Sequence, residues 1–310
     1  MKRTPGKLAP AFTVSQQYVG LSAARPVRAQ LGDKADAVAP HDHTFYEISV
    51  IHEGAATHQT ELFEAPVRHG SVLVIPPGKV HAIVDGAKLR GTNVYYLTES
   101  LLSGLGQLWE QESLVSLFLA DSLFPRSDHA KPFQFDLSAR EYEAARIDLE
   151  DMRQEWNASK PSVLYMETCF LKLLILLSRS YARQSPKEIG FRFGRPIWLA
   201  IKSIEATMLR SQSLSVAQIA RELNLSAHHF TRLFREATGW TPTEYFQMRR
   251  VHHACKMLLN PDCNISDVAH RLGYSDAAHL SRMFNRYRGM SPREYRRMYV
   301  SKPEPPHNPS

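Results

Sequence analysis

The 310-residue chain contains few cysteines and no long apolar run. Its three cysteines are scattered and form no CxxC pair, which excludes a disulfide framework and predicts packing roles in a reducing compartment. The longest apolar stretch, Phe170 to Leu177, contains Lys172 and falls far short of the roughly 20 residues that a membrane helix needs. The basic N-terminus is followed by no apolar signal core. We therefore expect a cytoplasmic protein without a membrane partner.

Acidic residues are scarce only in the last third of the chain. From Arg195 to the end there are 17 Lys+Arg against 9 Asp+Glu, whereas the first 194 residues carry 21 and 22. All of the net charge of +7 therefore comes from the C-terminal part. This asymmetry is typical of a nucleic-acid-binding module joined to a neutral domain, although a solvated basic surface would give the same count.

The basic third contains an internal repeat. The stretch "TRLFREATGWTPTEY" (Thr231 to Tyr245) aligns without gaps with "SRMFNRYRGMSPREY" (Ser281 to Tyr295) at an offset of 50. Arginine, phenylalanine, glycine, proline, glutamate and tyrosine recur in register. Upstream, "IARELNLS" matches "VAHRLGYS" at an offset of 49. A period of this length indicates two copies of one supersecondary unit.

Each copy predicts two short helices joined by a tight turn. In the first copy apolar residues recur at helical spacing, Ser215 and Ser226 are suitable N-caps, and Gly239 is a suitable C-cap. The second copy repeats this pattern and ends at Gly289. The stretch from Pro242 to Leu259 reads as one continuous helix that would act as a rigid spacer. Two such units in tandem within a basic region predict a pair of helix-turn-helix motifs.

The segment from Arg195 to Tyr299 resembles the DNA-binding domain of AraC/XylS-type transcription regulators. The residues that carry the resemblance are "IARELNLSAHHFTRLFREATGWTPTEY" and "DVAHRLGYSDAAHLSRMFNRYRGMSPREY". They cover about a third of the chain and are highly specific. The resemblance implies that both units enter successive major grooves of double-stranded DNA. It also implies contact with RNA polymerase.

The second helix of each unit should present its polar face to DNA. Arg232 and Arg282 hold the same repeat position and are our candidates for bidentate contacts to guanine. Further candidates can bond to base edges, contact a thymine methyl or bind phosphate: His228, Thr231, Arg235, Ala277, Ala278, Ser281 and Arg286. Asp276 would repel phosphate and is expected to cap its helix. For Arg249 and Arg250, a phosphate contact and a helix-stabilising pair are equally open.

The N-terminal part predicts a different architecture. Short apolar or alternating runs between Val27 and Leu97 are separated by glycine and proline, which predicts an antiparallel barrel or jelly roll. Two amphipathic helices follow, at 138–157 and 162–184. The expected fold is therefore α+β and multidomain: an arm and cupin-like sensor barrel (1–135), a helical dimerisation segment (136–184), a linker (185–195), a double helix-turn-helix domain (196–300) and a disordered tail (301–310).

Two motifs in the strand region resemble the cupin family. "HDHTFYEISVIHEG" (His41 to Gly54) matches the first cupin motif, and "GSVLVIPPGKVH" (Gly70 to His81) matches the second. Asp85 stands where the second motif ends in asparagine, which is a minor departure. The resemblance covers roughly Ala39 to Leu97.

The motif residues could hold a metal ion. On an extended strand His41, His43, Phe45 and Glu47 would share one face, and His81 would join them from a neighbouring strand. Three histidines and a glutamate suit a divalent zinc, manganese, iron or nickel ion. The same four residues could instead bind a polar ligand directly, or they could be packed interior groups. The last alternative is disfavoured, because burying Glu47 beside histidines without a ligand would be costly.

The tethered DNA-binding domain decides between two functions. Metal cupins include dioxygenases and sugar isomerases, so a metal-dependent enzyme fused to a DNA-binding domain is the alternative. We expect no enzyme but a transcription regulator, in which a small polar effector, a sugar or sugar derivative, binds His41, His43, Phe45, Glu47, His81 and Tyr95. Tyr46 and Tyr96 could also stack on a sugar ring, although ordinary strand packing explains each tyrosine equally well. The two helices after the barrel would pair two protomers into a homodimer.

Overall fold

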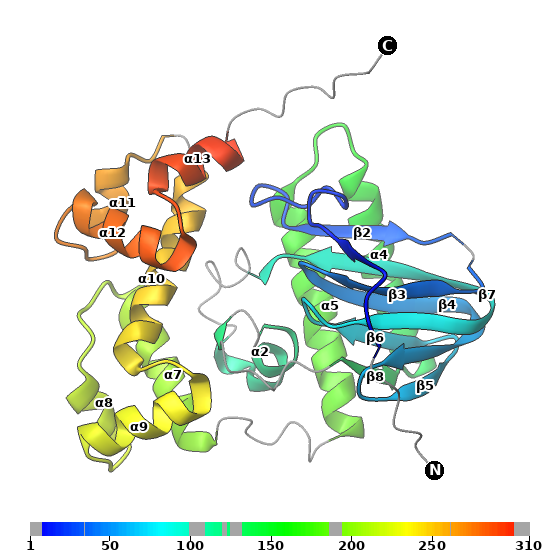
Figure 1. Ribbon diagram of the computed structural model, residues 1–310, viewed down its shortest axis with the longest axis horizontal. Helices are drawn as coiled ribbons and strands as arrows, with labels where there is room; N and C mark the ends of the chain where they lie inside the picture. The colour runs from blue at the N-terminus through cyan, green and yellow to red at the C-terminus, as the bar shows by residue number, and fades with distance from the viewer. Residues whose placement is uncertain are drawn as a thin grey trace.

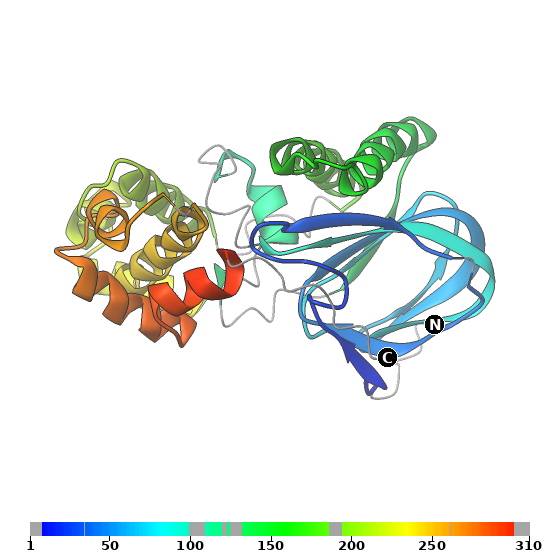
Figure 2. The same ribbon diagram turned by 90° about the horizontal axis from the view of Figure 1, so that it is seen from above.

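The computed structural model describes residues 8–33, 35–98, 109–119, 123–124, 132–185, 194–260 and 262–300. A strand-rich half and an all-helical half lie side by side, with helix α2 (Glu112–Phe118) between them (Figures 1 and 2). The predicted tail and residues 186–193 of the predicted linker lie outside the described residues. Within the described ranges, no helix is long and apolar enough to cross a membrane.

The N-terminal half is built on one mixed eight-stranded sheet with the order β1-β3-β7-β4-β6-β8, in which β2 also pairs with β7 and β5 with β4. The strands are β1 (Phe12–Val14), β2 (Val27–Leu31), β3 (Val38–His43), β4 (Tyr46–Thr60), β5 (Glu64–Val67), β6 (Ser71–Ile75), β7 (His81–Tyr96) and β8 (Phe133–Asp136). The long strands β4 and β7 are curved, so the sheet curls rather than lying flat (Figure 2). The predicted strand-rich domain is confirmed, and the pairings among β2 to β7 are antiparallel, as expected for Val27 to Leu97. The parallel pairing of β1 with β3 involves a strand that precedes the predicted region.

Side chains alternate between the two faces of this curled sheet. On β4, Ile48 and Val50 are fully buried in the main apolar core under the helices, whereas Glu47 and Ser49 face the interior. Gly54, which closes the first motif, has a φ of +83°, and a Cβ there would lie 2.5 Å from the Lys88 carbonyl oxygen. Only glycine fits this bend. Asp85 has a φ of +51°, a conformation that Asp and Asn tolerate better than most residues, which accounts for the departure from the cupin pattern.

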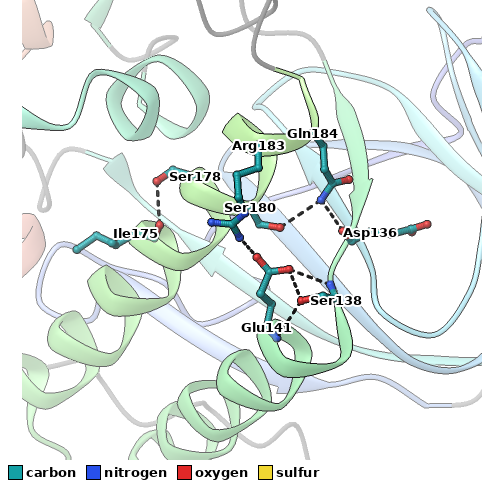
Figure 3. Close-up of polar contacts among 8 residues, drawn as sticks. All are labelled: Asp136, Ser138, Glu141, Ile175, Ser178, Ser180, Arg183 and Gln184. Carbon is teal, nitrogen blue, oxygen red and sulfur yellow. Dashed lines mark hydrogen bonds and ion pairs between the residues drawn. The ribbon is translucent and has the colours of Figure 1, made fainter.

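Two helices cover the outer face of the sheet, α4 (Ala139–Trp156) and α5 (Val163–Gln184). Both match the predicted helices. Ser138 and Glu141 form a capping box at the start of α4, and Arg183 near the end of α5 pairs with Glu141 (Figure 3). Gln184 donates to the Asp136 carbonyl oxygen at 2.7 Å, so the end of α5 is tied to β8 as well. The apolar side of α5 is buried against the sheet and α4, as its composition predicts.

The C-terminal half contains both predicted helix-turn-helix units. Its helices are α7 (Arg195–Leu209), α8 (Val216–Glu222), α9 (Ala227–Thr238), α10 (Pro242–Leu258), α11 (Ile265–Arg271), α12 (Ala277–Arg288) and α13 (Pro292–Val300). Ser215 and Ser226 cap α8 and α9, and Gly239 and Gly289 end α9 and α12 in the left-handed conformation, all as predicted. The spacer α10 runs continuously between the two units (Figure 1).

The two units belong to different apolar cores. Residues of the first unit share one core with α2, α5 and the outer face of the sheet. The second unit has a separate core built from α10 to α13. The first unit is thus joined to the N-terminal half by continuous packing, and the second is reached mainly through α10.

Candidate effector cavity and DNA-reading surface

The curled sheet encloses a cavity of about 460 Å³. This volume lies within the range of small-molecule binding sites. Its apolar lining includes Phe45, Ile51 and Leu73, and Phe12 of β1, which also lines it, stacks on His41 with ring centroids 5.2 Å apart. Its polar lining residues on β2, β3, β4 and β7 are Arg28, Gln30, His41, Glu47, Ser49, His81, Asn93 and Tyr95, and Tyr18 and Asp33 join them from outside these strands.

Strand register arranges six of these polar residues in two rows. Arg28 lies opposite Tyr95, and Tyr95 lies opposite Glu47, across β2, β7 and β4. Two residues further along, Gln30, Asn93 and Ser49 form the second row. Ser49 and Asn93 are hydrogen-bonded at 2.9 Å. A period of two along each strand places both rows on the cavity face.

Histidines gather at the end of the cavity formed by β3 and β7. His41 and His81 are direct partners in the pairing of β3 with β7, and their ring centroids lie 4.4 Å apart. One ligand atom each from His41, Glu47 and His81 lie within 4.8 Å of one another. His43 Nε2 is 3.6 Å from Glu47 Oε2. The structure therefore brings the four predicted metal-binding candidates together, with His43 outside the cavity lining.

The route to this arrangement differs from the prediction. His41 and His43 end β3, the chain bends at Thr44 and Phe45, and Glu47 lies on β4. The four residues of the first motif therefore do not share one extended strand. Convergence comes from β4 folding back beside β7, which also pairs with β3.

A fourth buried histidine, His58 on β4, was missed. Its ring centroid lies 5.7 Å from that of His81, and its Nδ1 contacts Gln134 Oε1 at 3.2 Å. Gln134 donates its amide to the Pro66 carbonyl oxygen, so its Oε1 accepts the proton from His58 Nδ1. His58 stands outside both motifs, and only its position within a bent 15-residue strand places it here.

Local hydrogen bonds set the tautomers of these rings. His41 Nδ1 lies 2.9 Å from the Ala39 carbonyl oxygen, and His43 Nδ1 lies 2.6 Å from that of Phe45. A carbonyl can only accept, so Nδ1 carries the proton and the Nε2 lone pair is available. The buried Nε2 atoms of His43 and His58, and both ring nitrogens of His81, have no hydrogen-bond partner. Buried ring nitrogens without a partner are available to a cation or to a ligand proton.

Burial shifts the pKa values of this cluster strongly. It lowers the pKa of His43 to about 4 and holds the pKa of His81 well below the usual histidine value. It raises the pKa of Glu47 to about 7, against a hydrogen bond from Ser49 that acts in the opposite direction. The imidazoles of His43 and His81 are therefore neutral at physiological pH, which is the form that binds metals and accepts hydrogen bonds.

The aromatic candidates separate into two groups. Phe45 and Tyr95 line the cavity and contact each other edge to face, with centroids 5.2 Å apart. Tyr46 and Tyr96 stack on each other on the opposite face and belong to the apolar core under the helices. Only the first pair can contact a ligand in the cavity, so ordinary packing explains Tyr46 and Tyr96.

The predicted DNA-reading residues lie on the polar faces of α9 and α12. The arginines Arg232, Arg235, Arg282 and Arg286 are exposed, as is His228. Thr231 and Ser281 are half-buried, and each hydroxyl is bonded to a backbone carbonyl of its own helix. Ala277, Ala278 and Ser281 line an open groove together with Arg293, a cation that is not among the predicted DNA-reading residues. Asp276 caps α12 by accepting from the His279 amide at 2.6 Å, as expected.

The phosphate-contact interpretation of Arg249 and Arg250 is wrong. Arg249 is fully buried and pairs with Glu205 of α7, with Nε 2.6 Å from Oε1. Arg250 donates to the Leu272 carbonyl oxygen at 2.6 Å and lies over the Tyr274 ring. Both side chains hold α10 to its neighbours, because α10 is surrounded by both units.

A connector links the cavity half to the first DNA-binding unit. It consists of residues 109–119 and 123–124 around α2. Tyr96, next to the cavity residue Tyr95, donates to the Phe118 carbonyl oxygen at 3.0 Å. At the other side, Trp240 Nε1 donates to the Leu123 carbonyl oxygen at 3.0 Å, and Lys202 pairs with Glu110 at 2.6 Å.

Comparison with known proteins agrees with this division. Residues 27–115 match the family described as "AraC-like ligand binding domain", and residues 206–298 match "Helix-turn-helix domain". A ligand-binding domain followed by a double helix-turn-helix domain defines a DNA-binding transcription regulator. The chain belongs to the AraC-type regulators.

Similar proteins cover most of the chain. It is 26% identical to the HTH-type transcriptional activator RhaR of Mannheimia succiniciproducens, over 84% of this chain and 88% of that protein. It is also 26% identical to the HTH-type transcriptional activator RhaS of Escherichia coli, over 83% and 86%. Among solved structures, unsaturated fatty acid-bound ToxT from Vibrio cholerae is 14% identical, covers 90% of this chain and 97% of its own, and has a TM-score of 0.40.

Proposed function

We propose that this regulator senses a small polar effector in the cavity of its curled sheet and adjusts DNA binding accordingly. The observation that carries the proposal is the cavity itself: a 460 Å³ space with converging polar groups, in a chain that also carries two DNA-binding units. Phe45 and Tyr95 would contact the apolar side of the effector. The names of the RhaR and RhaS relatives, both transcriptional activators, support a role in activation. A sugar or sugar derivative is the class that the resemblance to AraC-type regulators favours.

The connector is the proposed route from cavity to DNA. An effector beside Tyr95 would bias the position of Tyr96 and hence of the Phe118 carbonyl group that it binds. The connector packs on the first unit through Trp109 near Trp198 and Phe124 near Tyr245. An effector shifts DNA affinity only as far as it binds one arrangement of these parts more tightly than the other.

The histidine cluster fits a divalent metal ion. His41, Glu47 and His81 would hold it, because one ligand atom from each lies within 4.8 Å of the others, and His43 would be a further ligand, because its Nε2 lies 3.6 Å from Glu47 Oε2. The carbonyl groups that fix the rings of His41 and His43 are the usual outer partners of metal-binding histidines. A zinc, manganese, iron or nickel ion there would act as a Lewis acid toward oxygen ligands. Direct binding of a polar effector by the same groups is the alternative.

We further propose that the protein acts as a cytoplasmic homodimer that contacts RNA polymerase and does not turn its effector over. Dimerisation through α4 and α5 is supported by the exposed apolar residues Ile147, Leu164 and Tyr165 on these helices. The alternative, a metal-dependent enzyme, finds no support in the relatives, which are transcription regulators.

The sensing proposal is tested with the full chain. A preferred duplex is selected from a random pool, and its affinity is measured by fluorescence anisotropy with and without a panel of sugars and sugar derivatives. We expect at least one compound to change the affinity, and His81→Gln to abolish that response without weakening binding of the unliganded protein. Consumption of a panel compound, with no change in DNA affinity, would favour the enzyme instead.

The metal proposal has its own measurement. Elemental analysis of the purified full chain should find close to one zinc, manganese, iron or nickel ion per chain. The ion should be lost in His81→Gln and retained in His69→Gln, a matched change at an exposed histidine of the same domain. A parent protein without metal that still responds to the effector would establish the direct-binding alternative.

A further inference from the structure

The cavity contains a cation that forms no ion pair with a carboxylate of the described chain. Arg28 on β2 lines the cavity together with the carboxyl groups of Asp33 and Glu47, and among the described residues no ion pair joins it to either of them. Its Nε atom is buried and has no hydrogen-bond partner. A buried donor on a charged group that stays unpaired is costly, so a structure that keeps one suggests a missing partner.

The guanidinium group of Arg28 is held in place. Its Nη1 donates to the Val19 carbonyl oxygen at 2.7 Å, and its Cζ lies 5.2 Å from the centre of the Trp156 ring. These contacts come from the N-terminal arm, where Val19 also lines the cavity, and from the end of α4. An anchored guanidinium presents its remaining N–H donors in a fixed fork, which matches the two oxygens of a carboxylate.

Neutral polar groups lie beside this cation. The row of Gln30, Asn93 and Ser49 offers amide and hydroxyl groups that both donate and accept. Asn93 also donates to the Tyr95 hydroxyl at 3.1 Å. Groups of this kind recognise hydroxyls better than they recognise a second charge.

We propose that the effector is a sugar acid, a small polyhydroxylated carboxylic acid whose carboxylate binds Arg28 and whose hydroxyls bind the row of Gln30, Asn93 and Ser49. This inference rests on the proposed sensing function and narrows its ligand from sugars in general to their acids. A neutral sugar in the same cavity would leave the cation unpaired. The cavity therefore discriminates by charge as well as by shape.

The test is isothermal titration of the full-length protein with matched probes. D-Galacturonate and D-glucuronate are compared with D-galactose and D-glucose, which carry a hydroxymethyl group in place of the carboxylate. We expect at least one acid to bind, and its neutral counterpart to bind at least about tenfold more weakly. Arg28→Gln should lower the affinity for the acid about tenfold or more, and Arg28→Lys should restore part of this lost affinity. Arg68→Gln, a matched change at an exposed arginine of the same domain, should change the affinity less than about twofold.

Three results would overturn the proposal: binding of neither acid, equal binding of acid and sugar, or unchanged acid binding in Arg28→Gln. Thermal melting without ligand verifies that each variant is folded. Binding of a neutral sugar that is the same in the parent and in Arg28→Gln would refute the acid specificity but not the proposed sensing function. Acid binding that depends on Arg28 but does not change DNA affinity would support the acid-binding site and refute the proposed sensing function.

Discussion

Arg249 and Glu205 form an ion pair inside the first DNA-binding unit, where their side chains are 0% and 2% exposed. Two bonds join them, at 2.6 and 3.1 Å, and the Tyr245 hydroxyl donates to the same carboxylate at 2.8 Å. The pair ties α7 to α10, and Arg249 also lies 5.4 Å from the centre of the Trp109 ring of the connector. A buried pair of this kind tolerates the loss of neither partner, because the other charge would remain without water or counter-ion.

Glu205→Ala should therefore lower the free energy of unfolding of the DNA-binding half by about 3–5 kcal/mol. Urea unfolding followed by tryptophan fluorescence can measure this, since Trp198 and Trp240 both lie in that half. Arg232→Ala removes the exposed pair between Arg232 and Glu236 and should cost less than about 1 kcal/mol. Equal losses in the two variants would contradict the structural role of the buried pair.

Arg232→Ala and Arg282→Ala should each weaken binding to the preferred duplex by about 1–3 kcal/mol and relax the preference at one base position. Both arginines are exposed on the polar faces of α9 and α12, at equivalent places in the repeat. Competition binding against a set of single-base variants measures the relaxation. Arg286→Ala, at an expected phosphate contact, should weaken binding to all DNA sequences alike. It should also lower the slope of log affinity against log salt concentration by about one. Uniform weakening by all three variants would refute the base-reading assignment.

The sequence predicted the elements whose signals are local. The capping serines, the C-cap glycines and the apolar stripes of the repeat each act within one or two helical turns, so helices α8 to α12 were predicted from the sequence. The helical spacing of apolar residues likewise predicted α4 and α5. The two motifs around His41 and His81 located the histidine cluster, because the family resemblance carried the long-range pairing that spacing alone does not encode.

The missed features depend on contacts between distant segments. Arg28 lies next to Tyr95 only because β2 pairs with β7, 67 residues later, and His58 lies near His81 only because β4 folds back beside β7. The sequence does contain a signal for Arg28, since Arg28 and Gln30 alternate with the apolar Val27 and Ala29 in "VRAQL". This alternation places both polar residues on the same face of the strand. Arg249 misled the prediction because helical position alone cannot distinguish an exposed face from one covered by α7.

Trp240→Phe should uncouple the two halves of the protein. The substitution keeps an aromatic ring but removes the Nε1–H donor to the Leu123 carbonyl oxygen, which is a direct bond between the DNA-binding half and the connector. We expect the effector to bind the variant with nearly unchanged affinity and to change DNA affinity less than in the parent. Titration calorimetry for the effector and anisotropy for DNA, on the same preparation, measure the two affinities. An unchanged response of DNA binding would exclude this bond from the coupling route.

The stability of the DNA-binding half should fall as the pH drops below about 6.5, and His253 should account for part of the loss. Burial, followed by the charges of Arg249 and Lys256, lowers the pKa of His253 from 6.5 to about 3. Between these values the unfolded chain binds a proton that the folded chain does not, so the free energy of unfolding rises with pH across this window and is lost as the pH falls. The contribution of one such histidine is at most about 1.4 kcal/mol per pH unit. Urea unfolding at pH 7, 6 and 5 should show this dependence in the parent and a shallower one in His253→Gln. Identical slopes would mean that His253 takes up its proton without unfolding.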